Sequence, residues 1–345
     1  MTATCVATVA SPLQAMSLQE AVTAGVTAPP QTIIVHGAQA DVMTTLQLTD
    51  PALRAAADRG RGVRSRQARL AMLLRAREIV LGDPFSQLAH LALAGRHRRI
   101  VLLEDGASAL HAWRVLASEG ALARVHERRR TAAMLGTVAA NRLSRSARRT
   151  EVVVVGGLPV SSELSEALER RSIRHIRHDF AWARSVELPE TAGEHALAGA
   201  TRIVLGSALC VDGHIRRDVY EKWLRDRLGS EGDVFVPHRR EATWALQLAT
   251  DLGAHVCPSG HPCAELMLRD TPDDVVIHGF PMTAALTVPI VRSPRPTRFD
   301  VTHLVGGDWT PAAPARIVAL INEIDAIARQ HQPPGATPQA KIVPA

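Results

Sequence analysis

Three polar motifs in this 345-residue chain have side chains suited to acid–base or phosphate chemistry. In Glu104-Asp105-Gly106, a carboxylate could take a proton from a bound hydroxyl. In His261-Pro262, a histidine beside the amino terminus of a helix could bind a phosphate and protonate it as it leaves. The segment 237–241 (Pro-His-Arg-Arg-Glu) places guanidinium groups where they could bind an anionic nucleotide or sugar.

Each motif also has a purely structural interpretation. An acidic pair followed by glycine is typical of a helix amino terminus, where the acids suit the helix dipole. A lone His-Pro is typical of an ordinary loop, and two arginines beside a glutamate are typical of a solvated charge cluster. Taken singly, each motif favours the structural interpretation.

A metal site is a further alternative for the second half of the chain. Its four candidate ligands are His255, Cys257, His261 and Cys263. Nitrogen and sulfur ligands of this kind suit zinc, but the two cysteines are six residues apart and form no Cys-x-x-Cys motif. We therefore predict no metal, and zinc stays open as the alternative.

Short apolar runs alternate with helical patterns along most of the chain. We expect strands at 31–36, 99–103, 151–155, 173–176, 202–205, 233–236, 254–256 and 274–277. This alternation predicts parallel sheets in an α/β protein. The three polar motifs directly follow predicted strands, which is where such sheets bind ligands.

The length allows two domains, and a dense arginine stretch at 126–150 is our candidate linker between them. The predicted organisation is a flexible leader at 1–30, an N-terminal domain at 31–145, a C-terminal domain at 150–310, a C-terminal helix at 311–330 and a disordered tail at 331–345.

Composition limits the class of partner. Lysine and arginine exceed acidic residues by 40 to 34, giving a net charge of +6, which favours nucleotide phosphates, anionic sugars or an anionic membrane surface. Aromatic residues make up only 3% and are not interleaved with basic ones, so we expect no nucleic-acid binding. The four cysteines lack disulfide spacing, and we find neither a signal peptide nor an apolar run of about 20 residues. These features predict a cytoplasmic protein, with peripheral association with the inner membrane as an additional expectation.

The order of the motifs resembles the bacterial sialyltransferases of the polysialyltransferase and lipooligosaccharide-sialyltransferase type. That family has an acidic-acidic-Gly motif, then His-Pro, then a Ser/Thr motif. Two further segments are similar to it, 205–209 (Leu-Gly-Ser-Ala-Leu) and 234–241 (Val-Phe-Val-Pro-His-Arg-Arg-Glu). The resemblance covers residues 31–290.

The resemblance implies a GT-B-like fold, with two Rossmann-like doubly wound domains facing across a cleft. It implies an inverting, metal-independent enzyme without a cofactor, which moves sialic acid from CMP-sialic acid to a hydroxyl of a capsule or lipooligosaccharide glycan acceptor. Asp105 would be the general base and Glu104 would support it. His261 would bind the CMP phosphate and protonate it as it departs.

The resemblance also implies a set of donor-binding residues, namely Gly206, Arg239, Glu241, Gly260, Pro262 and Thr283. This sequence departs from the family in having one hydroxyl residue, Thr283, where two are usual. Ser207-Ala208 also replaces a Gln-Pro pair. Two alternatives therefore stay open: a GT-B glycosyltransferase that uses another nucleotide-linked sugar, and a degenerate homologue that binds a nucleotide without catalysis.

Overall fold

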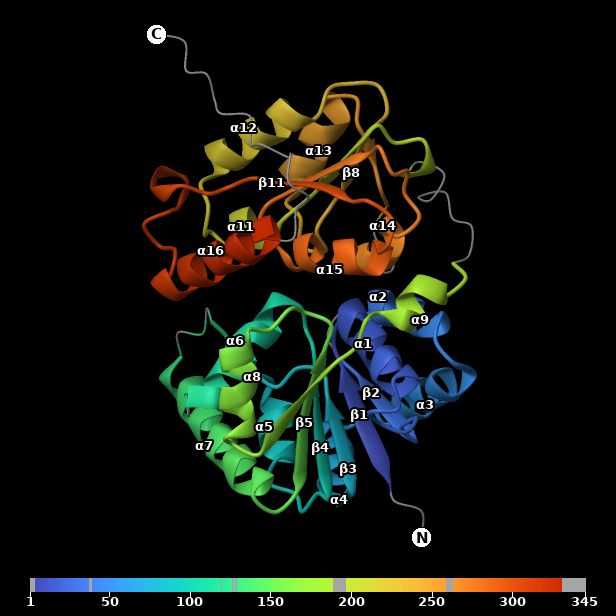
Figure 1. Cartoon of the computed structure of the whole chain (residues 1–345), viewed down its shortest axis with the longest axis vertical. Coiled ribbons are helices and arrows are strands. Elements are labelled where there is room, and N and C mark those ends of the chain that lie inside the picture. Colours follow the sequence, from blue (N-terminus) through green and yellow to red (C-terminus); the bar gives the residue numbers. More distant parts are fainter. Residues whose placement is uncertain are drawn as a thin grey trace. The chain divides into compact units, whose positions relative to one another are not determined.

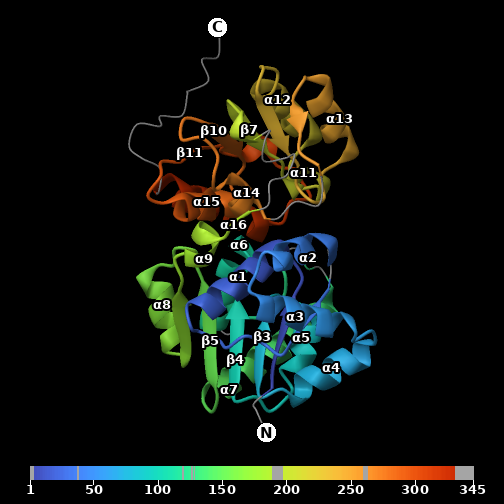
Figure 2. The same ribbon diagram turned by 90° about the vertical axis from the view of Figure 1, so that its right-hand side faces the viewer.

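The computed structural model describes residues 4–36, 39–118, 120–125, 127, 129–188, 197–258 and 263–330. These residues form two compact units (Figures 1 and 2). The first comprises Met1–Leu188 with Gly260–Leu266, and the second comprises Pro189–Ser259 with Met267–Ala345. Each unit is built on one parallel β-sheet.

The sheet of the first unit has the strand order β2-β1-β3-β4-β5-β6, with every neighbouring pair parallel. Its strands are β1 (Cys5–Val9), β2 (Thr32–Val35), β3 (Glu78–Leu81), β4 (Arg99–Leu103), β5 (Glu151–Gly156) and β6 (Ile173–Arg177). Because the order reverses between β1 and β3, their outgoing loops diverge there and leave room for a ligand.

Helices cover this sheet. They are α1 (Pro12–Thr23), α2 (Gln39–Gln47), α3 (Pro51–Arg61), α4 (Arg66–Arg75), α5 (Gln87–Ala92), α6 (Ala107–Ser118), α7 (Arg130–Ala147), α8 (Ser162–Glu169) and α9 (Ala181–Ser185). Alternate residues of β1, β2, β4 and β5 pack against apolar residues of α1, α2 and α3 in one buried core. The alternation follows from strand geometry, because successive side chains point to opposite faces of the sheet.

Serine and aspartate caps begin several of these helices. Ser11 caps α1 by accepting a hydrogen bond from the Gln14 amide at 3.2 Å, and Asp50 caps α3 in the same way through Ala52. Proline follows both caps at the first helical position, where its missing N–H costs nothing. These caps fix the positions at which α1 begins after β1 and α3 begins after α2.

The second unit has the strand order β11-β10-β7-β8-β9, again all parallel. Its elements are β7 (Arg202–Leu205), α11 (Ala208–Val211), α12 (Arg217–Arg227), β8 (Asp233–Val236), α13 (Thr243–Asp251), β9 (His255–Val256), β10 (Val276–Gly279), α15 (Thr283–Arg292), β11 (Arg298–Val301), the 3-10 helix η1 (Gly306–Asp308) and α16 (Ala315–Gln330). Helix α14 (Ala264–Leu268) spans the division between the units in the sequence. The switch point lies between β7 and β10.

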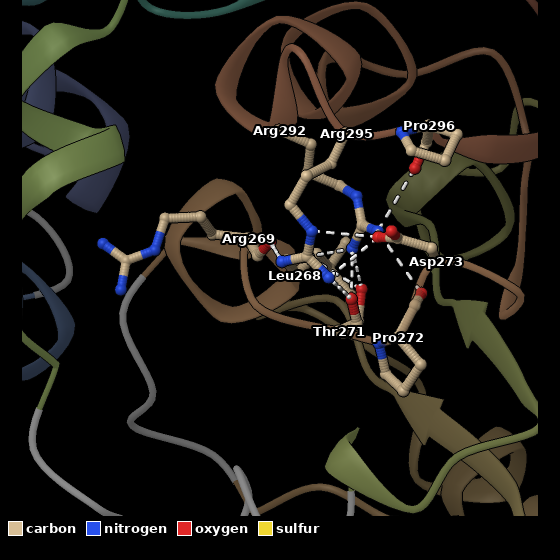
Figure 3. A network of polar contacts seen from close by, with 8 residues as sticks. All are labelled: Leu268, Arg269, Thr271, Pro272, Asp273, Arg292, Arg295 and Pro296. Atoms are coloured by element: carbon tan, nitrogen blue, oxygen red, sulfur yellow. Dashed lines mark hydrogen bonds and ion pairs between the residues drawn. The ribbon is translucent and has the colours of Figure 1, made fainter.

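A buried arginine fixes the segments that lead into β10 and β11 (Figure 3). Arg292, at the end of α15, is 3% exposed, and its guanidinium donates to the carbonyls of Leu268 (3.0 Å) and Thr271 (2.9 Å). It also pairs with Asp273 at 3.1 Å, and Arg295 joins the same carboxylate at 2.9 Å. Burial lowers the pKa of Arg292, and its hydrogen bonds compensate for the lost hydration.

The structure corrects the predicted leader and domain division. Residues 5–23 form β1 and α1, because the run Cys5–Val9 is wholly buried against the neighbouring strands. Strands β5 and β6 pair with the first sheet, so the first unit extends to Leu188. The predicted linker contains α7, whose small residues pack on the first unit. The C-terminal helix is present as α16, and the predicted tail lies outside the described residues.

Candidate functional site

The carboxyl edge of the first sheet gathers polar side chains at its switch point. Ser11 follows β1, Asp83 follows β3 and Asp105 follows β4. The Ser11 hydroxyl donates to Oδ1 of Asp105 at 3.0 Å, and Ser11 and Asp83 are both buried. The sequence-predicted Asp105 is therefore part of a cluster supplied by three strands.

The environment of Asp105 makes its carboxyl a weaker acid than usual. Burial raises the pKa of Asp105 and the nearby Asp83 carboxylate raises it further. Hydrogen bonds from Gln14 and Ser11, and the charge of Arg124, oppose that rise. A partly exposed carboxyl group with a raised pKa is suited to acid–base work.

Asp83 is held in place from two sides. Its Oδ1 accepts a hydrogen bond from the Phe85 amide at 3.0 Å, and its Oδ2 pairs with Arg124. His36, which follows β2, is close enough for Asp83 to raise its pKa, but burial outweighs this and the net shift is downward. Nε2 of His36 is buried without a partner among the described residues. The His36 imidazole is thus a third titratable side chain in the cluster, beside Asp83 and Asp105.

Glu104 has a different role from its neighbour. Its side chain is fully buried, and Oε2 accepts hydrogen bonds from the amides of Gly157 (2.6 Å) and Leu158 (2.9 Å). A Cβ at Gly156 would lie 2.4 Å from Oε2, so a glycine there makes room for the carboxyl group. Burial raises the pKa of Glu104 to about 8. Glu104 therefore positions the loop after β5.

Glu241 has a similar role in the second unit. The Tyr220 hydroxyl donates a hydrogen bond to Oε2 of Glu241 at 3.1 Å and accepts one from the Ser207 amide at 3.0 Å. Burial raises the pKa of Glu241 to about 7. A Cβ at Gly206 would lie 2.1 Å from Oε2 of Glu241, so Gly206 is required by this close approach. Glu241 and Gly206 thus hold together the loops that follow β8 and β7.

Two other predicted donor-binding residues lie at the carboxyl edge of the second sheet. Arg239 is exposed and forms no ion pair with a described residue, whereas its neighbour Arg240 pairs with Asp212 through both guanidinium nitrogens. Thr283 is the first residue of α15, directly after β10. The N-cap of α15, Met282, makes no side-chain cap hydrogen bond, and the Ala285 amide donates to the Met282 carbonyl at 3.1 Å.

The remaining predicted site residues, Gly260, His261 and Pro262, lie outside the described residues. So does one member of the zinc alternative, His261. Within the part of the chain that the structure describes, no three His, Cys, Asp or Glu side chains could hold a metal ion. In the same part, no helix is long and apolar enough to cross a membrane.

Sequence reasoning missed Ser11, Asp83 and Tyr220. The signal for Asp83 was available, since Glu78–Leu81 is a short apolar run closed by Gly82-Asp83, but an Ala/Leu/Arg-rich run at 66–76 precedes it without a break. Ser11 was assigned to the leader. Tyr220 and its partner Glu241 are 21 positions apart, and no motif in the sequence connects them.

Comparison with known proteins gives a fold and no family. No family model matches the chain, and no curated protein is significantly similar to it. A solved structure from Listeria monocytogenes, described as a UDP-N-acetylglucosamine 2-epimerase, matches with a TM-score of 0.50 at 11% identity. The match covers 96% of this chain and 92% of that one. The predicted fold of two Rossmann-like, GT-B-like domains is confirmed.

The same findings correct the predicted function. The resemblance to sialyltransferases has no support from any family model or curated protein, and the structural neighbour is described as an epimerase of a UDP-sugar. The prediction of sialic acid transfer from CMP-sialic acid was therefore wrong. The motifs misled because an acid after β4 and an Arg-x-Glu after β8 also serve the packing of a doubly wound fold, as Glu104 and Glu241 do here.

Proposed function

We propose that this chain is an enzyme that binds a nucleoside-diphosphate sugar, of the UDP-N-acetylglucosamine type, and transfers a proton at the sugar. The observation that carries the proposal is the position of α15. Its amino terminus directly follows β10, the strand beside the switch point of the second sheet, and Met282 provides no side-chain cap. Helix amino termini at such points bind diphosphates through first-turn amides and the helix dipole.

Two neighbouring features support an anionic ligand there. Arg239 is exposed without an ion-pair partner among the described residues, and the Tyr220–Glu241 contact holds its loop beside the loop after β7. The uridine assignment rests on the structural neighbour, which is described as acting on a UDP-sugar. This choice corresponds to the open alternative of another nucleotide-linked sugar.

Asp105 is the residue we propose for proton transfer. It is partly exposed, its pKa is raised by burial and by Asp83, and Ser11 orients one of its oxygens. Glu104 is a positioning residue in this proposal, because its oxygen Oε2 is occupied by two backbone amides. The chemistry assigned to these residues needs no resident cofactor.

The test is to incubate the purified protein with UDP-N-acetylglucosamine and follow the anomeric protons by NMR. A new sugar-nucleotide signal, or release of UDP, supports the proposal, provided that Asp105→Asn abolishes it. Binding of UDP without any product would instead support the non-catalytic alternative. Absence of both binding and product would overturn the proposal.

A further inference from the structure

The exposed face of α7 combines arginines with two large apolar side chains. The exposed residues of α7 are Arg130, Thr131, Met134, Thr137, Val138, Asn141, Arg142 and Arg145, and the exposed Arg148 and Arg149 follow directly. We refer to this set as the α7 face. Its members recur every three or four positions, so they lie along one side of the helix. The 18-residue helix is about 27 Å long.

The opposite side of α7 is buried and attaches the helix to the first unit. Gly136, Ala139, Ala140, Leu143 and Ala147 are buried. They pack α7 against α5 and β5 of the first unit, and Figure 1 shows the helix on the outer flank of that unit. The α7 face is therefore presented by a helix that is already fixed in the fold.

The charge of this face is not balanced locally. The sequence of α7 has no acidic residue, and none of the arginines of the α7 face forms an ion pair with a described residue. The whole chain has a net charge of +6, so the five arginines of the α7 face account for much of its excess positive charge. The helix dipole favours arginine near the carboxyl end, but it disfavours Arg130 at the amino end. Helix stability alone does not account for the pattern.

The apolar residues decide which anionic partner fits. Met134 is 63% exposed and Val138 is 42% exposed, and both lie between the arginines at the two ends of the α7 face. Single-stranded nucleic acids are bound through aromatic stacking, and no aromatic residue is among those of the α7 face. A basic helix with exposed apolar side chains between its charges is suited to the boundary between lipid headgroups and acyl chains.

We propose that the α7 face docks this protein on an anionic lipid surface. The arginines bind headgroup phosphates, and Met134 and Val138 enter the upper acyl region. Each basic residue near such a surface strengthens binding roughly fivefold, so five together give a stable but salt-sensitive attachment. This proposal is independent of the substrate of the enzyme.

The experiment is flotation of the purified full chain with vesicles of phosphatidylcholine alone or of phosphatidylcholine with phosphatidylglycerol. We expect binding only to the anionic vesicles, and release at about 0.5 M salt, where the Debye length is only a few ångströms. The double variant Arg142→Glu/Arg145→Glu should bind at least about tenfold more weakly. The variant Met134→Ser/Val138→Ser keeps the charge and should also bind several-fold more weakly.

The matched control is Lys222→Glu/Arg225→Glu on α12, which makes the same change in net charge at two exposed positions. It should float like the wild type, and circular dichroism should show that all variants are folded. The proposal is overturned by equal binding to both vesicle types, by no vesicle binding, or by equal weakening in the control. It is also overturned if an RNA oligonucleotide, rather than the vesicles, is bound through the α7 face.

Discussion

Ser11 and Asp105 are joined by a hydrogen bond of 3.0 Å between the serine hydroxyl and Oδ1 of the carboxyl group. The two residues are 94 positions apart in the sequence, and the bond links the loop after β1 to the loop after β4. Gln14 also hydrogen-bonds the Asp105 carboxyl group, so side chains from α1 and its N-cap orient it. A carboxyl group held in this way is a suitable proton carrier for a bound sugar.

The variant Asp105→Asn should lose about 10²- to 10⁴-fold in turnover of a UDP-sugar, because the amide cannot exchange the proton. UDP binding should be unchanged, since the proposed diphosphate contacts come from α15 and Arg239 and not from Asp105. Ser11→Ala should lose less turnover, because the carboxyl group remains. Steady-state kinetics with UDP titrations check this, and full turnover by Asp105→Asn would contradict the role of Asp105.

The fully buried Glu104 and the partly buried Glu241 should make folding stability depend on pH. Their pKa values are raised from 4.5 to about 8 and about 7, so between these limits the folded state holds protons that the unfolded state has lost. The contribution of these two groups to the free energy of unfolding is therefore greatest at pH 4.5 and below, and it falls as the pH rises toward 8. The slope is at most about 1.4 kcal/mol per pH unit for each group.

Glu104→Gln keeps an oxygen acceptor for the amides of Gly157 and Leu158 and removes the titration. Urea unfolding at pH 5, 6, 7 and 8 should show a flatter profile for this variant than for the wild type. Glu231→Gln, at an exposed loop position, is the control and should leave the wild-type slope unchanged. A wild-type profile that rises from pH 5 to 8 with the same slope in Glu104→Gln would count against the assigned shift.

Gly206→Ala should damage the second unit even though the substitution is small. The added Cβ would lie 2.1 Å from Oε2 of Glu241 and 2.8 Å from the His238 amide nitrogen, so the loop after β8 must move. We expect a loss of about 1–3 kcal/mol in unfolding free energy, as for overpacking, together with weaker UDP binding. Gly307→Ala is a matched control, because nothing lies within 4 Å of its Cβ position. Equal stability of the two variants would show that the close approach is not rigid.

Arg292→Met should destabilise the second unit by about 2–4 kcal/mol, because it removes the buried guanidinium that bonds the carbonyls of Leu268 and Thr271 and pairs with Asp273. Thermal unfolding measures the loss. Arg298→Met, at an exposed position in β11, should change stability by less than about 0.5 kcal/mol. Similar melting temperatures for both variants would mean that the hydrogen bonds and ion pairs in Figure 3 contribute little to the stability of the second unit.

The sequence was informative where a strand is both apolar and β-branched. The runs that became β4, β5, β7 and β8 are of this kind, and each ends at glycine or a charged motif. β1 was missed because small and polar residues surround it and it lies at the beginning of the chain. β3 was missed because its four residues follow an Ala/Leu/Arg-rich helical run, and only pairing with β1 and β4 distinguishes it.

The site was predicted only in part, for a similar reason. Asp105 and Glu241 were singled out because charged residues after strands are visible in a sequence, and their role in a site stays a prediction. The separate roles of Glu104 and Asp105 were not visible, since these depend on which oxygen meets a backbone amide. The nature of the nucleotide was predicted incorrectly, because motif order is not specific when its residues also stabilise the fold.

Isothermal titration calorimetry of the wild-type protein with UDP, UDP-N-acetylglucosamine and CMP-sialic acid measures directly which nucleotide the protein binds. We expect saturable binding of UDP and of UDP-N-acetylglucosamine, weakened in Arg239→Ala, and no binding of CMP-sialic acid. Saturable binding of CMP-sialic acid alone, or no binding of either uridine nucleotide, would contradict it.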